Sequence, residues 1–247
     1  MALKRAADLR RRVACVAITL AFAIAPAAAR ADDGAAAKRE DAGTSSLVEL
    51  NTGFLLLPGA LVCPQTIDPA TCKRGEFSLV FGIQNIWRWR DFGFGGGIQW
   101  ATTLRSDAAQ GDPSLERSHS RRYFLVEAQA RYYFVNQKRW RGWAGVTIGG
   151  IVVNDSWTVK ADREPYTDTA FVGPRAATLG TEGLALGLCI GGEWRFANDW
   201  SIGPSLRYSN WFLPDARKQS PTLDVASLGG RLDMIDVGLR IAYRIAL

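Results

Sequence analysis

The stretch 236–247, "DVGLRIAYRIAL", has the most regular alternation in this chain. Apolar side chains occupy every second position in it: Val237, Leu239, Ile241, Tyr243, Ile245 and Leu247. Between them lie small residues and two arginines, Arg240 and Arg244. A period of two residues is typical of a β-strand. The stretch therefore predicts a strand with one fully apolar face and one face that carries charge.

The same alternation recurs in seven earlier segments. They cover residues 47–57, 76–89, 92–104, 123–134, 143–153, 182–196 and 200–212, and the final segment begins near Arg231. Short turns follow the second, fourth and sixth segments, whereas long polar loops at 58–75, 105–121, 154–180 and 213–230 follow the others. An even number of antiparallel strands with short turns at one end and long loops at the other is typical of outer-membrane β-barrels.

The first residues predict export. Five cationic side chains within residues 4–12 precede the apolar run 13–25, and Ala29-Arg30-Ala31 has the form of a cleavage site. This pattern predicts a signal peptide over residues 1–31, because the apolar run is too short to span a membrane as a helix. Residues 32–45 are expected to form a flexible periplasmic tail, and residues 46–247 the barrel.

Removal of the signal peptide nearly neutralises the chain. The full sequence has 30 Lys and Arg against 24 Asp and Glu. Residues 1–31 contain six of the basic residues and one of the acidic ones, so the mature chain is left at about +1. A nucleic-acid-binding surface is not expected, because it would need an excess of clustered positive charge.

The nature of the two strand faces separates a membrane barrel from a soluble one. A lipocalin would also show eight alternating strands after a signal peptide, with its apolar face in the lumen. Here Phe, Trp, Leu, Ile and Tyr dominate one face, and they are too bulky for one narrow lumen. The other face holds Gly, Ala, Ser and charged residues, so we expect an all-β, eight-stranded antiparallel up-and-down transmembrane barrel. Aromatic residues near the strand ends, such as Trp87, Trp143, Trp157, Trp200 and Trp211, are expected to form interfacial girdles.

At this level the chain resembles the OmpA-like family of small outer-membrane barrels. The resemblance covers residues 45–247 and rests on the strand pattern. The final "YRIAL" is similar to the C-terminal signal that the barrel-assembly machinery reads, with Leu247 in place of the usual aromatic residue. The resemblance implies a monomer in the outer membrane of a Gram-negative cell, in contact with outer-membrane lipid and lipopolysaccharide.

Cysteine usage fits an oxidising compartment. Cys63 and Cys72 lie in the first long loop and are predicted to form a disulfide. Two cysteines without a nearby histidine make a poor metal site, so neither a metal nor a cofactor is expected. Cys189 is expected to face inward as a small buried thiol.

The sequence offers little for catalysis. The one histidine, His119, falls in the second long loop and is expected to be a solvated surface residue. "RYSN", residues 207–210, resembles the His-x-Ser-Asn motif of lipid A deacylase barrels, but Arg207 replaces the histidine and cannot act as a base near neutral pH. An enzyme is therefore not expected, and lipid A modification stays the weakest alternative.

The inward charges are expected to form a paired network that plugs the lumen. They are Glu49, Glu127, Arg131, Glu193, Arg195, Arg207, Arg240 and Arg244. This pattern favours a structural role, or an adhesive role carried by the extracellular loops. A narrow gated channel for ions or small solutes is the rival interpretation. Basic loop residues such as Arg121 and Arg122 could meet lipopolysaccharide phosphates.

Overall fold

The barrel lies within residues Asp41–Leu247 of a computed structural model. The structure describes residues 44–62, 73–104, 117–159, 162–163, 171–172, 175–218 and 225–247. The expected signal peptide, nearly all of the expected tail and the predicted Cys63–Cys72 disulfide lie outside these residues. They remain predictions.

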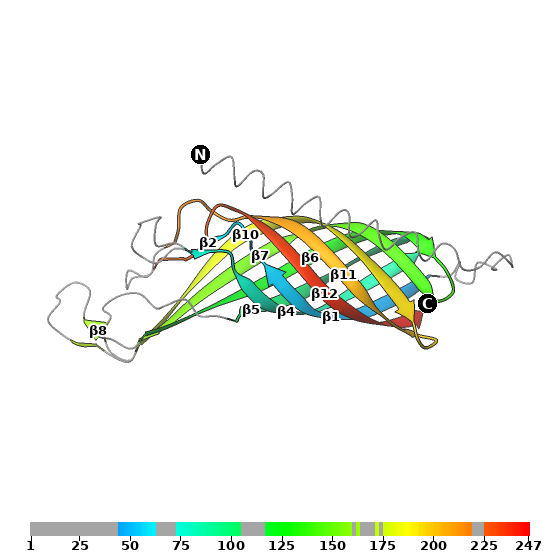
Figure 1. Cartoon of the computed structure of the whole chain (residues 1–247), viewed down its shortest axis with the longest axis horizontal. Coiled ribbons are helices and arrows are strands. Elements are labelled where there is room, and N and C mark those ends of the chain that lie inside the picture. The colour runs from blue at the N-terminus through cyan, green and yellow to red at the C-terminus, as the bar shows by residue number, and fades with distance from the viewer. Residues whose placement is uncertain are drawn as a thin grey trace. The chain divides into compact units, whose positions relative to one another are not determined.

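Eight long strands form one closed antiparallel barrel (Figure 1). They are β1 (Ser45–Leu56), β4 (Phe77–Trp89), β5 (Phe92–Thr103), β6 (Arg117–Asn136), β7 (Trp140–Val159), β10 (Arg175–Arg195), β11 (Trp200–Phe212) and β12 (Arg231–Ala246). Each strand pairs with its neighbours in the chain, and β12 pairs with β1. Two short ribbons, β2 (Leu61–Val62) with β3 (Lys73–Arg74) and β8 (Asp162–Arg163) with β9 (Phe171–Val172), belong to the long-loop side. The predicted up-and-down barrel is confirmed.

The seam between the first and last strands closes the barrel. Its register runs from Ser45 opposite Ala246 to Leu56 opposite Ile235. The two backbones approach closely where Gly53 faces Gly238. A Cβ on Gly53 would lie only 2.3 Å from the carbonyl oxygen of Val237. Glycine is therefore needed at this point of the seam.

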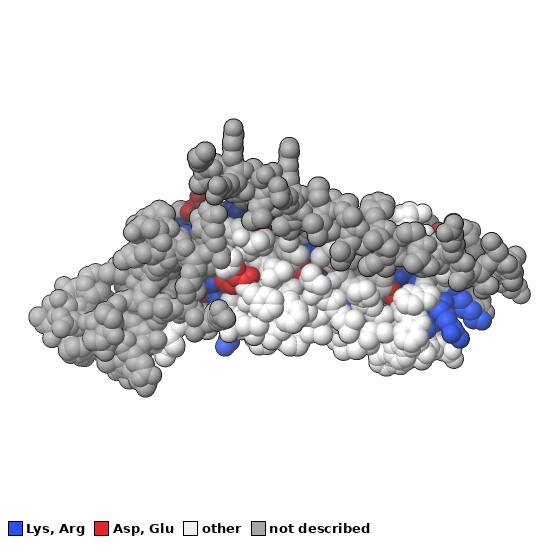
Figure 2. All heavy atoms as spheres, in the orientation of Figure 1, with Lys and Arg blue, Asp and Glu red and all other residues white. Residues whose placement is uncertain are grey.

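The outer wall is apolar around the whole circumference. The exposed large side chains include Leu50, Phe81, Ile98, Val126, Val146, Leu188, Tyr208 and Leu239. Figure 2 shows mostly uncharged atoms over the described part of this wall, with a group of Lys and Arg atoms near the end where β12 finishes. No helix among the described residues is long and apolar enough to cross a membrane. Large apolar side chains that face outward on every strand are those of a wall in contact with lipid.

The lumen is filled by layers of different chemistry. Along β6, the inward positions include His119, Arg121 and Tyr123 at the long-loop end, continue through Leu125 to Glu127, and reach Arg131 near the short turns. Leu125 belongs to a buried apolar cluster that also includes Leu55, Val80, Ile151, Val153, Trp211, Leu228 and Met234. This apolar layer differs from the expected lumen of small and polar residues. Its members on the strands lie at inward positions near the long-loop ends, and Leu228 comes from the segment before β12.

Strands β6, β7 and β10 are longer than the sequence pattern predicted. The expected loops 105–121 and 154–180 are partly strand, because β6 begins at Arg117, β7 ends at Val159 and β10 begins at Arg175. Alternation persists in these extensions, but the buried positions are polar, such as His119 and Arg121, so apolar periodicity did not detect them. Figure 1 shows the three ribbons continuing past the ends of the other strands.

Several tryptophans lie inside the barrel and not in the expected girdles. Trp143, Trp157 and Trp211 are all buried, because they occupy inward positions of β7 and β11. Trp87 and Trp200 are exposed near the short turns, as expected. Proximity to a strand end therefore predicts a girdle only when the residue also has outward parity.

The lipid-facing wall predicts a cost for outward charge. Leu239 is 44% exposed in the middle of β12, whereas Leu247 is 72% exposed at its end. Leu239→Arg should lower the unfolding free energy in vesicles by about 2–4 kcal/mol, and Leu247→Arg by about 0–1 kcal/mol, because the penalty depends on depth. Urea titration of refolded protein, followed by tryptophan fluorescence, measures the difference. Equal effects of the two variants would contradict a membrane-spanning β12.

Candidate functional site

Glu49 is the centre of the ionic network in the short-turn half of the lumen. Its side chain is 1% exposed. Arg131 donates to both of its carboxylate oxygens across the lumen, with Nη1 to Oε1 at 2.6 Å and Nη2 to Oε2 at 2.7 Å. Arg240 donates to Oε2 at 3.2 Å. A bidentate contact of this kind is strong and directional, so one carboxylate holds two arginines from different strands.

Trp143 contacts the same two arginines. The guanidinium carbon of Arg131 lies 4.1 Å from a ring centroid of Trp143, and that of Arg240 lies 4.7 Å from it. Cations within about 6 Å of an indole face are attracted to its π electrons. The ring therefore supports two like charges that a single carboxylate does not fully neutralise.

A second ion pair lies nearer the apolar layer. Arg207 donates to Glu127 Oε2 at 2.7 Å and to Gln99 Oε1 at 2.8 Å. Asp236 is buried beside this pair, within the electrostatic influence of Arg207. The sequence predicted Glu127 and Arg207 as members of the network but not Asp236. Asp236 lies at an inward position of β12, as Arg240 does.

The other predicted members lie close to the short turns. Glu193 is 6% exposed, and both of its carboxylate oxygens lack a hydrogen-bond donor among the described residues. Arg195 lines a small space near the β6–β7 turn. Arg244 lies 3.8 Å from Asp199, and their side chains are 22% and 46% exposed, so this pair is at the rim and not inside the lumen.

Two further arginines at this end were missed. Arg88 is buried over the ring of Tyr133, at 4.8 Å from its centroid, and Arg141 is also buried. The signal that could have found Arg88 is its even spacing from the inward positions Gln84 and Ile86.

The remaining lumen residues have plain roles. Cys189 faces inward, as predicted, where Gln129 donates to its sulfur at 2.7 Å. In the stretch "RYSN", Arg207 and Ser209 are buried in the lumen and Tyr208 faces outward. Arg207 is held by Glu127, and this contact gives it a structural task.

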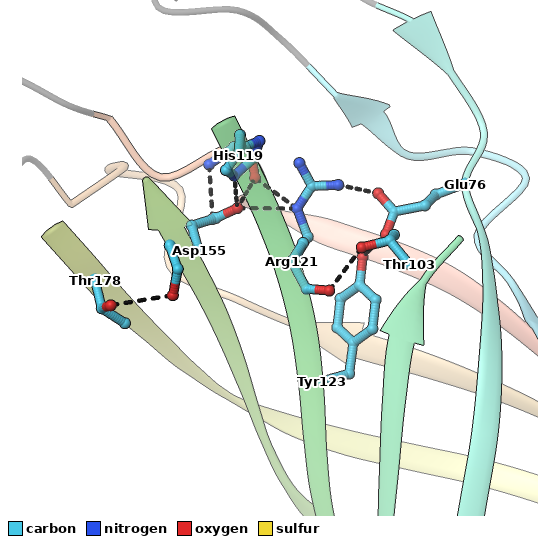
Figure 3. Close-up of polar contacts among 9 residues, drawn as sticks. Glu76, Thr103, His119, Arg121, Tyr123, Asp155 and Thr178 are labelled. Carbon is cyan, nitrogen blue, oxygen red and sulfur yellow. Dashed lines mark hydrogen bonds and ion pairs between the residues drawn. The ribbon is translucent and has the colours of Figure 1, made fainter. Parts of the chain in front are cut away.

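A polar cluster closes the lumen at the long-loop end (Figure 3). Asp155 lies at its centre and is fully buried. Its Oδ1 is 2.8 Å from His119 Nε2 and accepts hydrogen bonds from Arg121 Nε at 3.0 Å and Ser227 Oγ at 2.5 Å. Its Oδ2 accepts from the backbone N–H of Ser227 at 3.0 Å. One carboxylate thus connects β6, β7 and the segment before β12.

Neighbouring contacts extend this cluster. Arg121 also pairs with Glu76, and the Tyr123 hydroxyl donates to the same carboxylate (Figure 3). Thr103 donates to the backbone oxygen of Arg121 at 2.6 Å. The ring of His119 stacks on Trp157, with 4.9 Å between ring centroids. We call the set Glu76, His119, Arg121, Asp155 and Ser227 the mouth cluster.

The expectation that His119 is a solvated surface residue is wrong. It is 6% exposed, because it faces inward on the β6 extension between Asp155 and Trp157. Arg121, which was expected in an exposed loop, is buried in the same cluster. Ser227 and His119 both bind Asp155, so the geometry is that of a clamp and not of a serine activated by a histidine.

The clamp brings a segment of the last long loop over the lumen. Ala226, Ser227 and Leu228 are all buried, and Leu228 packs in the apolar cluster with Tyr123 and Trp211. Arg121 Nε also donates to Ser227 Oγ at 2.7 Å. The mouth cluster therefore holds residues 226–228 as a cover on the apolar layer.

Asp155 lies beyond the apolar outer band, since its neighbours Asn154 and Ser156 face outward there. Burial raises the pKa of its carboxyl, but the hydrogen bond with His119, the charge of Arg121 and the bonds from Ser227 outweigh burial, so the pKa is below its ordinary value. A carboxyl with a lowered pKa stabilises the fold above its unfolded-state pKa.

Glu49→Gln should destabilise the barrel by about 3–5 kcal/mol, because it leaves Arg131 and Arg240 buried without their anion. Chemical denaturation of the refolded protein measures this loss. Asp199→Asn removes a half-exposed partner of Arg244 and serves as the matched control, with little expected change. If the two variants were equally stable, the network around Glu49 would not hold the lumen together.

Asp155→Asn should lower stability at neutral pH, and the difference from the unchanged protein should shrink as the pH falls below about 4, where the unfolded carboxyl also binds a proton. Thermal unfolding at a series of pH values tests this prediction. Asp91→Asn, in a short turn, is the control. A difference that grows on acidification would contradict a lowered pKa for Asp155.

No protein-family model and no curated protein matches the sequence. Solved structures do match the fold. A major outer membrane protein from Thermus thermophilus has a TM-score of 0.54 at 12% identity, covering 82% of this chain and 99% of that chain.

Two other solved structures give lower scores. Neisserial surface protein A (NspA) has a TM-score of 0.43 at 10% identity, covering 81% of this chain and 98% of that chain. Ail, the attachment invasion locus protein of Yersinia pestis, has a TM-score of 0.43 at 11% identity, covering 83% and 100%. Identities this low concern the fold alone. The architecture is that of a small outer-membrane β-barrel, which confirms the resemblance to OmpA-like barrels at this level.

Proposed function

We propose that this protein is a non-enzymatic outer-membrane barrel with a closed lumen, which acts through the surface that it presents outside the cell. In this orientation the short turns face the periplasm and the long loops face outward. The observation that carries the proposal is the combination of a blocked lumen with a sheet that extends beyond the lipid-facing band.

The filled lumen supports a closed barrel. Eight strands leave an interior only wide enough for side chains. Here the ionic layer around Glu49, the apolar layer and the cover at 226–228 follow one another along the axis. A gated channel, the rival function, would require at least the cover and the ion pairs of Glu49 to move together.

The extended sheet supports a role outside the cell. The outward side chains of β7 change from Ile148 and Val152 to Asn154, Ser156 and Thr158. On the neighbouring strand, Thr178 Oγ1 lies 3.0 Å from Ser156 Oγ. Small hydroxyl side chains on a sheet that is supported from below by the mouth cluster form a firm polar surface for macromolecular contact.

The edges of the extension differ from the barrel wall. The last described pair of β10 with β11 is Leu184 with Phe212, so residues 175–183 have no described strand partner on that side. Lys218 donates to the carbonyl oxygen of Gly180 at 2.7 Å and protects part of this edge. We propose that an extended segment of another protein could pair with this edge.

Lipopolysaccharide is the lipid partner that we propose. Arg231 is exposed at the start of β12, where Asn210 Oδ1 accepts from its Nε at 2.6 Å and Phe212 lies under its guanidinium at 5.6 Å. Arg122 is exposed on β6, next to the lipid-facing Phe124. Arginines at the upper limit of the apolar band suit phosphate groups of the outer leaflet. Recognition of β12 by the barrel-assembly machinery and a monomeric state belong to the same proposal.

Lipid A modification is the weaker alternative. The side chains of Arg207 and Ser209 are turned into the lumen, away from the acyl chains of the bilayer. No specific contact among the described residues favours this activity.

Purified protein in planar bilayers should show only small and infrequent conductance, because its lumen has no continuous water path.

Cells of a non-adherent host that express the chain should bind immobilised matrix proteins or glycosaminoglycans more than vector-only cells do. Replacing Ser120, Ser156 and Thr178 together by Glu should reduce that binding, with the gel shift between unheated and boiled samples as the test of folding. A large, steady conductance in the bilayer experiment would favour the channel function. If the triple variant adhered as well as the unchanged protein, the extended sheet would not be the surface that binds.

A further inference from the structure

The cationic residues in the short turns are concentrated on one side of the rim. Arg90 lies in the β4–β5 turn, and Lys138 and Arg139 lie in the β6–β7 turn. All three side chains are exposed, and Asp91 is the one carboxylate in these two turns. The β10–β11 turn carries Asp199 and no cation. Figure 2 shows a group of Lys and Arg atoms at this end of the barrel.

Arg90 adopts a backbone conformation that is unusual for its residue type. Its φ is 55°, and no other residue except glycine has a positive φ in the described part of the chain. Gly, Asn and Asp are the usual residues in such a turn, because other side chains are strained there. Arg88 Nε donates to the carbonyl oxygen of Arg90 at 3.0 Å, and the N–H of Tyr133 donates to that of Asp91 at 2.8 Å. A strained position that keeps a long cationic side chain points to a use for that side chain.

The side chain of Arg90 lies over the lipid-facing wall. Its guanidinium carbon is 5.2 Å from a ring centroid of Trp89, which is 49% exposed on the outward face of β4. Beside it, Phe92 also faces outward, with its ring centroid 5.4 Å from that of Tyr132. A guanidinium has five N–H donors, so contact with a ring leaves donors for an oxyanion. The cation therefore lies at the edge of an aromatic band, where lipid headgroups begin.

The β6–β7 turn repeats this arrangement. Lys138 and Arg139 directly precede Trp140, whose exposed ring stacks on that of Trp194 with 6.2 Å between centroids. The N–H of Arg195 donates to the carbonyl oxygen of Arg139 at 2.8 Å, which fixes the turn to β10. Because β5 pairs with β6, the two cationic turns are neighbours on the rim.

We propose that this sector of the rim, Arg90, Lys138 and Arg139 with the rings of Trp89 and Trp140, binds anionic phospholipids such as phosphatidylglycerol in the periplasmic leaflet. The cations bind the phosphodiester, while the rings contact the glycerol and the upper acyl chains. A lipid fits better than a soluble anion, because the cations border an exposed apolar wall. The proposal takes only the orientation of the barrel from the proposed function, since the extended sheet lies at the opposite end.

Tryptophan quenching tests the proposal on the full barrel, refolded into phosphatidylcholine vesicles that contain brominated phosphatidylglycerol or brominated phosphatidylcholine. The bromine is placed in the upper part of the acyl chain, near the expected depth of Trp89 and Trp140. Brominated phosphatidylglycerol should reach half-maximal quenching at a mole fraction at least about fivefold lower, which is the effect of about one cation at an anionic surface. High salt should reduce this preference.

Variants at the rim locate the effect. Arg90→Asn removes the charge but suits the left-handed backbone, so the gel shift of the folded barrel should persist while the preference falls. Arg90→Lys keeps the charge and should keep most of the preference. Adding Lys138→Gln and Arg139→Gln to Arg90→Asn should bring the two lipids close to equal affinity. Arg217→Gln, in the last long loop, changes the net charge as Arg90→Asn does and should leave the preference unchanged.

Equal quenching by the two brominated lipids would overturn the inference. An equal loss of preference in Arg90→Asn and Arg217→Gln would also overturn it, because net charge and not the rim would then attract the lipid. Displacement of the lipid by glycerol phosphate at matched ionic strength would make the ligand a free phosphate, and displacement by soluble peptidoglycan fragments would make it the cell wall. None of these results depends on adhesion through the extended sheet, so the two proposals fail independently.

Discussion

Backbone pairing between β1 and β12 closes the barrel and sets the geometry of its lumen. In lipid, an open sheet edge would leave amide and carbonyl groups without partners, and each would cost several kcal/mol. Closure fixes the register from Ser45 opposite Ala246 to Leu56 opposite Ile235. The register in turn fixes which side chains face the lumen. Eight strands then leave an interior that side chains must fill. The positions of Glu49, Trp143 and Asp155 all follow from that closed and narrow geometry.

The two ends of the lumen are built differently. At the long-loop end, apolar packing and the mouth cluster exclude water, and the carboxylate of Asp155 is fully satisfied by His119, Arg121 and Ser227. At the short-turn end, cations outnumber carboxylates around the small space near the β6–β7 turn, and Glu193 lacks a donor among the described residues. A saturated network favours rigidity, whereas an unsaturated one favours exchange with solvent and solutes. The described lumen is therefore more firmly held at its long-loop end than at its short-turn end.

Sequence periodicity predicted the strands well because parity is a local property. The row from Val237 to Leu247 and the inward sides of Glu127 and Arg240 could be read without a structure. The partners of these side chains could not be predicted, because Glu49 meets Arg131 only across the lumen. Parity tells which face of the sheet a residue lies on, but not which residue lies opposite it. His119 and Trp143 show the same limit: the first lies in a strand with polar buried positions, and the second is a bulky residue on the inward face. An alternation measured by hydrophobicity alone misses both.

The ion pairs of Glu49 also bear on the order in which the barrel forms. Arg131 is 82 residues away from Glu49 in the chain, and Arg240 is 191 residues away. Contacts between such distant positions form late, because loop closure has to precede them. Until β12 joins β1, the carboxylate and both guanidinium groups must remain hydrated, since their transfer into the bilayer without partners would be costly. The final strand therefore completes charge neutralisation in the same event that completes the wall, which makes insertion and lumen packing a single cooperative step.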